Sequence, residues 1–242
     1  ATLTAQAERP PAPDIGIRIR PRILEIEESL VADLSRKPKL GVSPGIIGWR
    51  NEHLKSLAAL PHVLTGLTRL VAVVAGGATP PVSLRAMLLD KVTPLLKDLG
   101  AAPGTTNPRP RNVRPVEGKD TIRKLSTRVA YELEKSSITR ALRPYQMAVG
   151  VAGGAEVVSK AAQAAADLYD LAIIEIDGTS AFHLQRRDVA FRAMQEVAPL
   201  TAAALGQFYQ RTSEKLIQVG THLRSMLILV GNRETRAQVG PS

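Results

Sequence analysis

The chain has 242 residues and a formal net charge of +10, and 44% of its residues are hydrophobic but only 3% are aromatic. A core is therefore possible, and it has to be built from Leu, Ile, Val and Ala. Because the sequence contains no cysteine, disulfides, thiolate-bound zinc and thiol catalysis are excluded. The excess of Lys and Arg favours a polyanionic partner, since clustered cations raise the affinity for phosphate backbones. The alternatives are a basic protein without such a partner and, less in keeping with the pattern, an acidic substrate or a membrane surface.

Residues 1–22 are rich in Pro, Arg and small residues, so we expect a basic arm without regular structure. The arm shows no pattern typical of a secretory signal, and its Arg residues could contact nucleic acid or remain solvated. The longest apolar stretch, 57–78, contains His62, Arg69 and a Gly-Gly pair, which predicts a core helix and its exit rather than a membrane span. We therefore expect an intracellular protein, nuclear or cytoplasmic, with no membrane partner.

Periodicity and turn residues predict the remaining elements in chain order. Helices are expected over 23–34, 49–57, 60–74, a short stretch ending at 89, 121–136, 155–169, 187–197 and 201–213. Strands are expected over 92–96 and 171–176, and a β-hairpin over 215–219 and 226–230. Pro94 lacks an N–H, which predicts that 92–96 is an edge strand. Trp49, the only tryptophan, is expected to anchor the core.

The expected helix 121–136 carries an apolar face, made of Ile122, Leu125, Val129 and Leu133. Helices and strands are mixed along the chain without strict βα alternation. This mixture predicts an α+β fold with a helix-rich N-terminal region and a small antiparallel sheet.

The stretch 171–182 reads L-A-I-I-E-I-D-G-T-S-A-F and places a carboxylate, Asp177, at the end of a short apolar run. An acid at the end of a buried strand is a candidate metal ligand or catalytic group. Phe182 follows five residues later, and a turn of that length would bring it back beside the carboxylate. The alternative is a strand-end Asp that caps a turn with Gly178. Since Mg²⁺ takes hard oxygen ligands and keeps several waters, one carboxylate can supply only part of a magnesium site.

Six segments occur in an order that is more specific than any one of them. They are G-V-S-P-G-I-I-G-W-R-N-E-H-L at 41–54, K-V-T-P-L-L-K at 91–97, N-V-R-P-V at 112–116, the helix at 121–133, P-Y-Q-M-A-V-G-V-A-G-G-A-E at 144–156, and D-G-T-S-A-F at 177–182. In order and spacing they resemble the N-terminal portion of the reverse transcriptase domain of a non-LTR-type mobile element. The resemblance covers residues from about 41 to the end of the chain.

The resemblance implies RNA-directed DNA synthesis, with an RNA template, a DNA primer and deoxynucleoside triphosphates as partners. It implies that Asp177 is the catalytic residue and the ligand of two Mg²⁺ ions, and that Phe182 discriminates deoxyribose from ribose. The turn that starts at Gly178 would give its backbone N–H groups to the triphosphate, as anion-binding turns do. Two-metal phosphoryl transfer also needs a second acid nearby.

The resemblance also assigns basic and template-side residues. Arg114 and Lys97 would hold phosphate, since Arg suits bidentate contacts and Lys acts as a point charge. Arg111 belongs to the same Pro-rich segment and would contact nucleic acid, and Gln146 and Gly150 would lie near the template strand. The alternative for the three cations is an ordinary solvated loop.

By the same resemblance, residues 1–40 form a basic arm and short helix, 41–120 a fingers-like segment, and 121–242 a partial palm that stops before the family's Asp-Asp hairpin. His183 stands where the family has Asn or Asp, and 235–242 replaces its Q-G-D-P-L-G-P loop. We therefore expect a fragment that cannot polymerise alone. The alternative is a degenerate, non-catalytic remnant that binds nucleic acid.

A more distant alternative is an NAD-type oxidoreductase. Gly150, Gly153 and Gly154 nearly spell a dinucleotide fingerprint, followed by a helix and by Asp177. Ala148 stands in place of the first glycine, however, and 142–146 is too polar for a buried parallel strand. The four histidines have no metal-ligand spacing.

Overall fold

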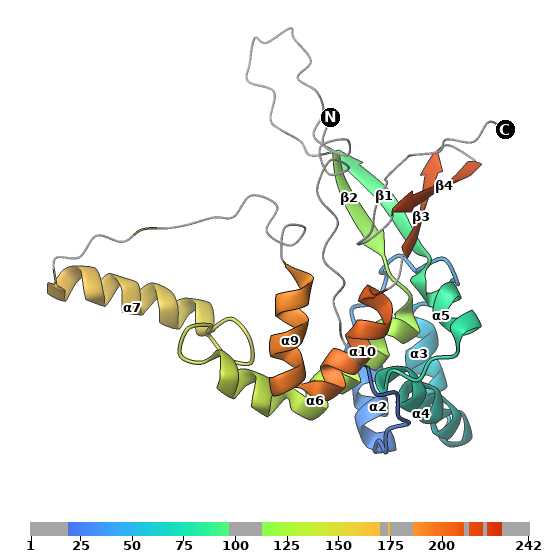
Figure 1. Ribbon diagram of the computed structural model, residues 1–242, viewed down its shortest axis with the longest axis horizontal. Coiled ribbons are helices and arrows are strands. Elements are labelled where there is room, and N and C mark those ends of the chain that lie inside the picture. The colour runs from blue at the N-terminus through green and yellow to red at the C-terminus, as the bar shows by residue number, and fades with distance from the viewer. Residues whose placement is uncertain are drawn as a thin grey trace, which may run out of the picture.

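The computed structural model describes residues 19–96, 113–169, 174 and 186–210, together with the backbone of two late strands at 213–219 and 222–228. The helices are α2 (Glu28–Arg36), α3 (Asn51–Leu57), α4 (Pro61–Ala75), α5 (Pro81–Leu88), α6 (Thr121–Leu142), α7 (Gly154–Tyr169), α9 (Arg187–Val197) and α10 (Pro199–Tyr209). The strands are β1 (Asp90–Leu96), β2 (Val113–Gly118), β3 (Ser213–Val219) and β4 (His222–Ile228). In Figure 1 the sheet stands at one end of a helical body, and α7 projects away from that body.

The α+β fold class is confirmed, but the sheet is mixed rather than antiparallel. Its strand order is β2-β1-β3-β4, with β1 antiparallel to β2, β3 antiparallel to β4, and β1 parallel to β3. The late β-hairpin was expected, and its register places Val219 opposite His222. The parallel pairing of β1 with β3 was not predicted, because it joins segments more than a hundred residues apart.

The expectation that β1 is an edge strand is wrong, and the reason lies in the register. Strand β1 lies between β2 and β3, but its pairing with β3 covers only Asp90 to Val92. Pro94 lies beyond that stretch and faces Pro115 of β2, where neither residue has an N–H to donate. The proline is tolerated because the ladder to β3 has ended before it.

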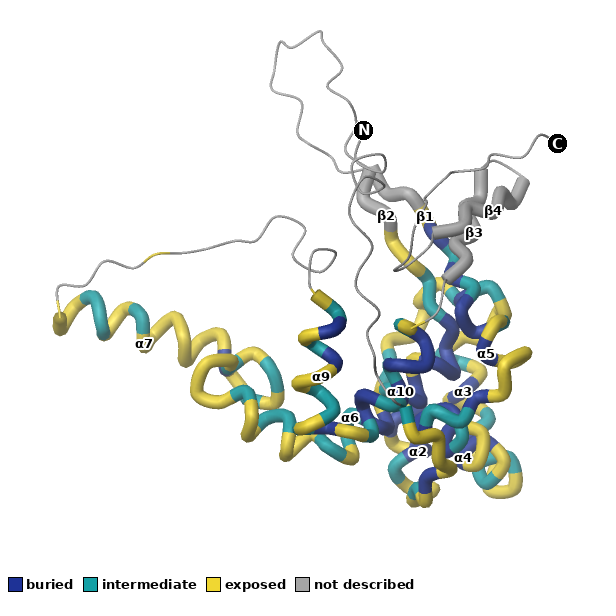
Figure 2. Tube along the Cα trace, viewed as in Figure 1, coloured by how far each residue is buried: buried dark blue, intermediate teal, exposed yellow. Residues whose placement is uncertain are grey.

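The core is aliphatic, as the composition predicted, and lies where α2, α4, α6 and α10 meet (Figure 2). Its most deeply buried large side chains are Val31, Leu34, Leu54, Val71, Val74 and Val129, and Phe208 of α10 is buried with them. A buried amide also joins two of the helices, because Gln207 Nε2 donates to the backbone oxygen of Val74 at 2.6 Å. Helices α4 and α10 are thus fastened by packing and by a hydrogen bond inside the core.

The first helix begins later than predicted because its N-terminal residues pair with another element. Leu24 N donates to Ala72 O at 3.3 Å and Arg22 N donates to Gly76 O at 3.1 Å, so this stretch runs extended beside the end of α4. A Cβ on Gly76 would overlap the carbonyl oxygen of Arg22, so only glycine allows this approach. Gly77, with φ of 75°, then turns the chain away from α4.

Two further expectations change in the structure. Trp49 is 36% exposed rather than a core anchor, because it lies in a loop and contacts only the edge of His53 among described aromatic rings. Leu133 is 43% exposed because its part of α6 has left the core, whereas Ile122, Leu125 and Val129 are buried as predicted.

Of the expected buried strand 171–176, the structure describes only Ile174. This residue belongs to no regular element and is 81% exposed, so the prediction is wrong at this position. The side chain is not covered by the described part of the fold. Among all the residues that the structure describes, no helix is long and apolar enough to cross a membrane.

Candidate nucleic-acid interface

The structure places only some of the predicted site residues. Asp177, Gly178, Phe182, Lys97 and Arg111 lie outside the described residues. The backbone of Arg114 lies in β2, opposite Leu95 of β1. Gln146 and Gly150, the two predicted template-side residues, are described in full. Both lie in the connection between α6 and α7, and this connection is therefore the candidate site.

Gln146 lies in the turn that follows α6. Its N–H donates to Leu142 O at 2.9 Å, which closes the turn after the last residue of α6. Its side-chain oxygen accepts from Ala148 N at 2.6 Å, so the carboxamide closes a two-residue turn of its own backbone. The exposed Gln146 side chain therefore shapes the connection in addition to any contact that it makes with a ligand.

Gly150 brings the connection back against α6. Its φ is 68°, and a Cβ on it would overlap Thr139 Oγ1 of α6, so both the conformation and the space require glycine. Gly153 has φ of 66°, and a Cβ on the buried Gly154 would overlap Met147 O. The glycine-rich run thus serves a tight connection between two helices. Since α6 rather than a strand precedes it, the layout of a dinucleotide-binding βαβ unit is not present here.

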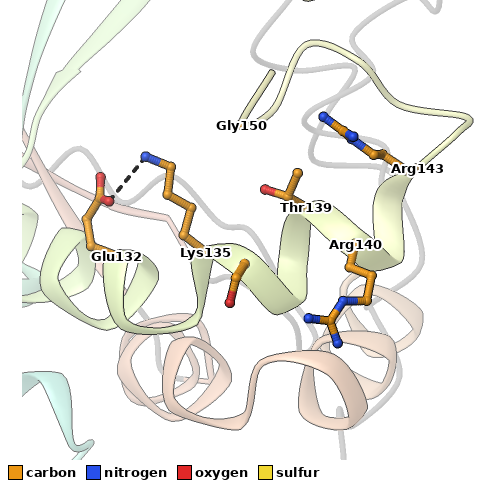
Figure 3. A pocket seen from close by; sticks show the side chains of 7 residues that line it. Glu132, Lys135, Thr139, Arg140, Arg143 and Gly150 are labelled. Carbon is orange, nitrogen blue, oxygen red and sulfur yellow. Dashed lines mark hydrogen bonds and ion pairs between the residues drawn. The ribbon is translucent and has the colours of Figure 1, made fainter. Parts of the chain in front are cut away.

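A hollow of about 650 Å³ lies between the connection and the C-terminal half of α6 (Figure 3). Three cations and one carboxylate are among its lining residues, which are Glu132, Lys135, Ser136, Thr139, Arg140, Arg143 and Gly150. Lys135 Nζ lies 3.3 Å from Glu132 Oε2, which forms a surface ion pair. In Figure 3, Arg143 and Thr139 face the Gly150 backbone, whereas Arg140 points away.

Three exposed basic residues of α6, Lys124, Arg128 and Lys135, lie on one side of the helix, because they are spaced by four and seven residues. Arg143, also exposed, follows the last residue of α6 in extended backbone. We call these four residues the basic face of α6. At 1.5 Å per residue, the face extends over about 30 Å and ends in the hollow. Such a row of cations fits the phosphates of an extended polynucleotide better than a single small anion.

The sequence prediction included Gln146 and Gly150 but missed the basic face. Its signal is present in the sequence as Lys and Arg at helical spacing. The same helix also carries the apolar face of Ile122, Leu125 and Val129, which dominates its sequence pattern.

The segment 41–54, which is the first of the six segments of the resemblance, has a structural role. The N–H of Gly41 donates to the Glu52 carboxylate, and this bond is the largest cause of the lowered pKa of Glu52. Asn51 Nδ2 donates to Lys39 O at 2.7 Å. Leu54, by contrast, is buried in the core. Together these residues hold the loop before α3 against the first turn of that helix.

The described residues bring no three acidic, histidine or cysteine side chains together, so they form no metal site of that kind. The predicted magnesium ligand, Asp177, lies outside them. A scan against protein-family models found no match for the chain, and a search of curated proteins found none either.

Proposed function

We propose that the chain is the fingers and partial palm of an RNA-directed DNA polymerase. The observation that carries the proposal is the ordered set of six sequence segments at 41–54, 91–97, 112–116, 121–133, 144–156 and 177–182. The fold is compatible with it, because β1 and β2 form an antiparallel pair that α6 follows directly, and a glycine-rich connection leads on to α7. Synthesis of DNA on an RNA template would take place in the nucleus or cytoplasm.

In this proposal the side chains have the roles that the resemblance assigns to them. Asp177 offers a hard carboxylate ligand, and two bound Mg²⁺ ions would activate the primer hydroxyl and neutralise the triphosphate. Phe182 would exclude the 2′-hydroxyl of a ribonucleotide by steric contact. Arg114, whose backbone lies at the end of β2 away from α6, and Lys97 would hold phosphate.

In this proposal the basic face of α6, which lies within the described residues, would bind the nucleic acid. Gly150 and Gln146 lie beside the end of that face, in and next to the hollow. A template strand that follows the face would pass both predicted template-side residues. Its affinity would come from phosphate contacts, which carry no sequence preference.

The proposal is tested by primer extension with the full product of the gene that encodes this chain. We expect Mg²⁺-dependent extension of an oligo(dT) primer on poly(rA), and loss of at least about 100-fold in Asp177→Asn, because even partners of metal ligands cost 10- to 100-fold when removed. Asp167→Asn is the matched control. Asp167 is exposed on α7, where its carboxylate accepts hydrogen bonds from Gln163. Full activity in Asp177→Asn would rule out the proposed mechanism.

The second candidate, a non-catalytic remnant that binds nucleic acid, is favoured by His183 and by the altered segment 235–242. It predicts salt-dependent binding of RNA and DNA with no Mg²⁺-dependent synthesis by the same gene product. The primer-extension assay and a binding assay on one preparation therefore separate the two functions.

A further inference from the structure

A second group of basic residues lies at the start of α6, at the end of that helix opposite the hollow. It surrounds the last residue of α10 and comprises Lys119, Arg123, Arg187, Phe208 and Tyr209, which we call the Tyr209 cluster. Three separate parts of the chain supply these residues: the start of α6, the start of α9 and the end of α10. None of the residues was singled out by sequence reasoning.

Three cations converge on one aromatic ring in this cluster. Lys119 Nζ lies 5.7 Å, Arg187 Cζ 5.4 Å and Arg123 Cζ 5.9 Å from the ring centroid of Tyr209. Lys119 Nζ also donates to the Tyr209 hydroxyl at 3.4 Å. An aromatic face attracts one cation, but three positive charges around one ring repel each other.

Arg123 has the partners of a structural residue. It is buried, its Nη1 lies 3.5 Å from Asp90 Oδ1, and its guanidinium stacks on Phe208 with Cζ 4.5 Å from that centroid. A buried arginine that is paired and stacked in this way fastens β1, α6 and α10 together. It therefore needs no ligand.

Arg187 is different, because its half-buried guanidinium is incompletely satisfied. Its Nη1 is inaccessible to solvent and has no hydrogen-bond partner among the described residues. Burial lowers the pKa of Arg187, and its Coulombic interactions with Tyr209 and Glu117 only partly oppose that effect. A buried charged donor without an acceptor is costly, and such groups commonly mark a place for an ion or an ordered water.

We propose that Lys119 and Arg187 bind a polyphosphate oxyanion beside Tyr209. The distances of both cations to one ring limit their separation to a span that two or three linked phosphates can cover. The anion would accept from the accessible N–H groups of the half-buried Arg187 guanidinium and from Lys119 Nζ, and it would offset the positive charge that these two residues place beside the ring. The phosphates could belong to a nucleoside triphosphate or to a nucleic-acid backbone, since both present the same oxyanions.

The site is independent of the proposed polymerase activity, because it can be measured without template, primer or magnesium. The probe is inorganic tripolyphosphate, titrated calorimetrically into the chain at low salt. We expect binding by the wild type and a loss of about tenfold or more in each of Lys119→Met and Arg187→Met, since each removes a charge-assisted contact.

The matched control is the double variant Lys55→Met/Arg69→Met, which removes two exposed cations from α3 and α4. Its affinity for tripolyphosphate should equal that of the wild type. An equal loss in this control and in the cluster variants would overturn the proposal, because it would show that any cation of the chain serves. Absence of binding by the wild type would overturn it as well.

Thermal unfolding separates a binding role from a structural one. Arg187→Met replaces a partly buried, incompletely satisfied cation by an apolar side chain of similar length, so we expect an unchanged or higher Tm together with weaker binding. A lower Tm with unchanged tripolyphosphate affinity would show that Arg187 only supports the fold. Competition then identifies the source of the phosphate: displacement by dTTP indicates a nucleotide, and displacement by a short oligothymidylate indicates a nucleic-acid backbone.

Discussion

At the scale of single residues, the clearest electrostatic feature is Asp188 in the first turn of α9. Arg186 Nη2 lies 2.7 Å and Arg192 Nη2 2.9 Å from Asp188 Oδ2, and Arg186 Nε donates to the other carboxylate oxygen at 3.1 Å. The hydrogen bonds from Arg186 are the largest cause that lowers the pKa of Asp188 from 3.8 to about 2. The carboxylate is therefore ionised in the folded protein at acidities where it is protonated in the unfolded chain.

This depressed pKa predicts a stability effect with a defined pH window. The folded pKa lies below the unfolded one, so the contribution is complete above about pH 4 to 5 and is lost as the pH falls toward 2. Asp188→Asn should consequently be less stable than the wild type in urea at pH 7, and the difference should shrink toward pH 2. Asp33→Asn, which removes an exposed ion pair with Arg36 on α2, should have little effect at either pH. A difference that is constant down to pH 2 would mean that packing, not charge, makes Asp188 important.

At the scale of whole elements, α10 depends on a cap that another helix supplies. Glu134 of α6 accepts from Leu200 N at 2.9 Å and from Thr201 N at 2.7 Å, so one carboxylate satisfies two N–H groups in the first turn of α10. Ala198, the N-cap residue, has no side-chain oxygen with which to do so. The negative charge also lies at the positive end of the helix dipole.

Glu134→Ala should therefore destabilise the protein by about 1 kcal/mol, the usual cost of removing an N-cap side chain. Glu132→Ala is the matched control, because it changes the same residue type in the same helix but breaks only a surface pair with Lys135, worth about 0.2–0.5 kcal/mol. Urea unfolding of both variants measures the two costs. Equal costs for the two variants would show that the Glu134 contacts contribute no more than a surface charge.

The difference between local signals and distant pairing explains which parts of the fold the sequence could predict. The positions of α3, α4, α5, α7 and α9 follow from apolar spacing, prolines at the first turn and glycines after the last one, all of which are local signals. The late start of α2 and the internal position of β1 were not predictable in this way. Both depend on pairing with distant segments, Ala72 and Gly76 in one case and β3 in the other.

At the scale of the whole molecule, the candidate sites were only partly predictable. Gln146 and Gly150 were predicted because they occur in a recognisable motif, and their template-side role stays a prediction, although Gly150 lines the hollow. The Tyr209 cluster could not be found, because Lys119, Arg187 and Tyr209 are far apart in sequence and meet only where three helix ends converge. Aromatic residues surrounded by cations leave no periodic signal.

The net charge of +10 predicts affinity for nucleic acid but does not say which cations provide it. If the basic face of α6 is the interface, each of its contacts with a single strand neutralises one phosphate and contributes about 0.7 to the slope of log K against log salt. Lys135→Ala/Arg143→Ala should weaken binding of single-stranded RNA and reduce that slope by about 1.4.

The matched control for this prediction is Lys55→Ala/Arg69→Ala, which removes the same charges from exposed positions on α3 and α4. Both double variants lower the net charge equally, so any effect of overall charge is common to them. A change of slope confined to the first variant would locate the nucleic acid on α6. Equal changes would mean that binding follows the net charge of the molecule, because a polyanion held without a preferred surface responds to every exposed cation alike.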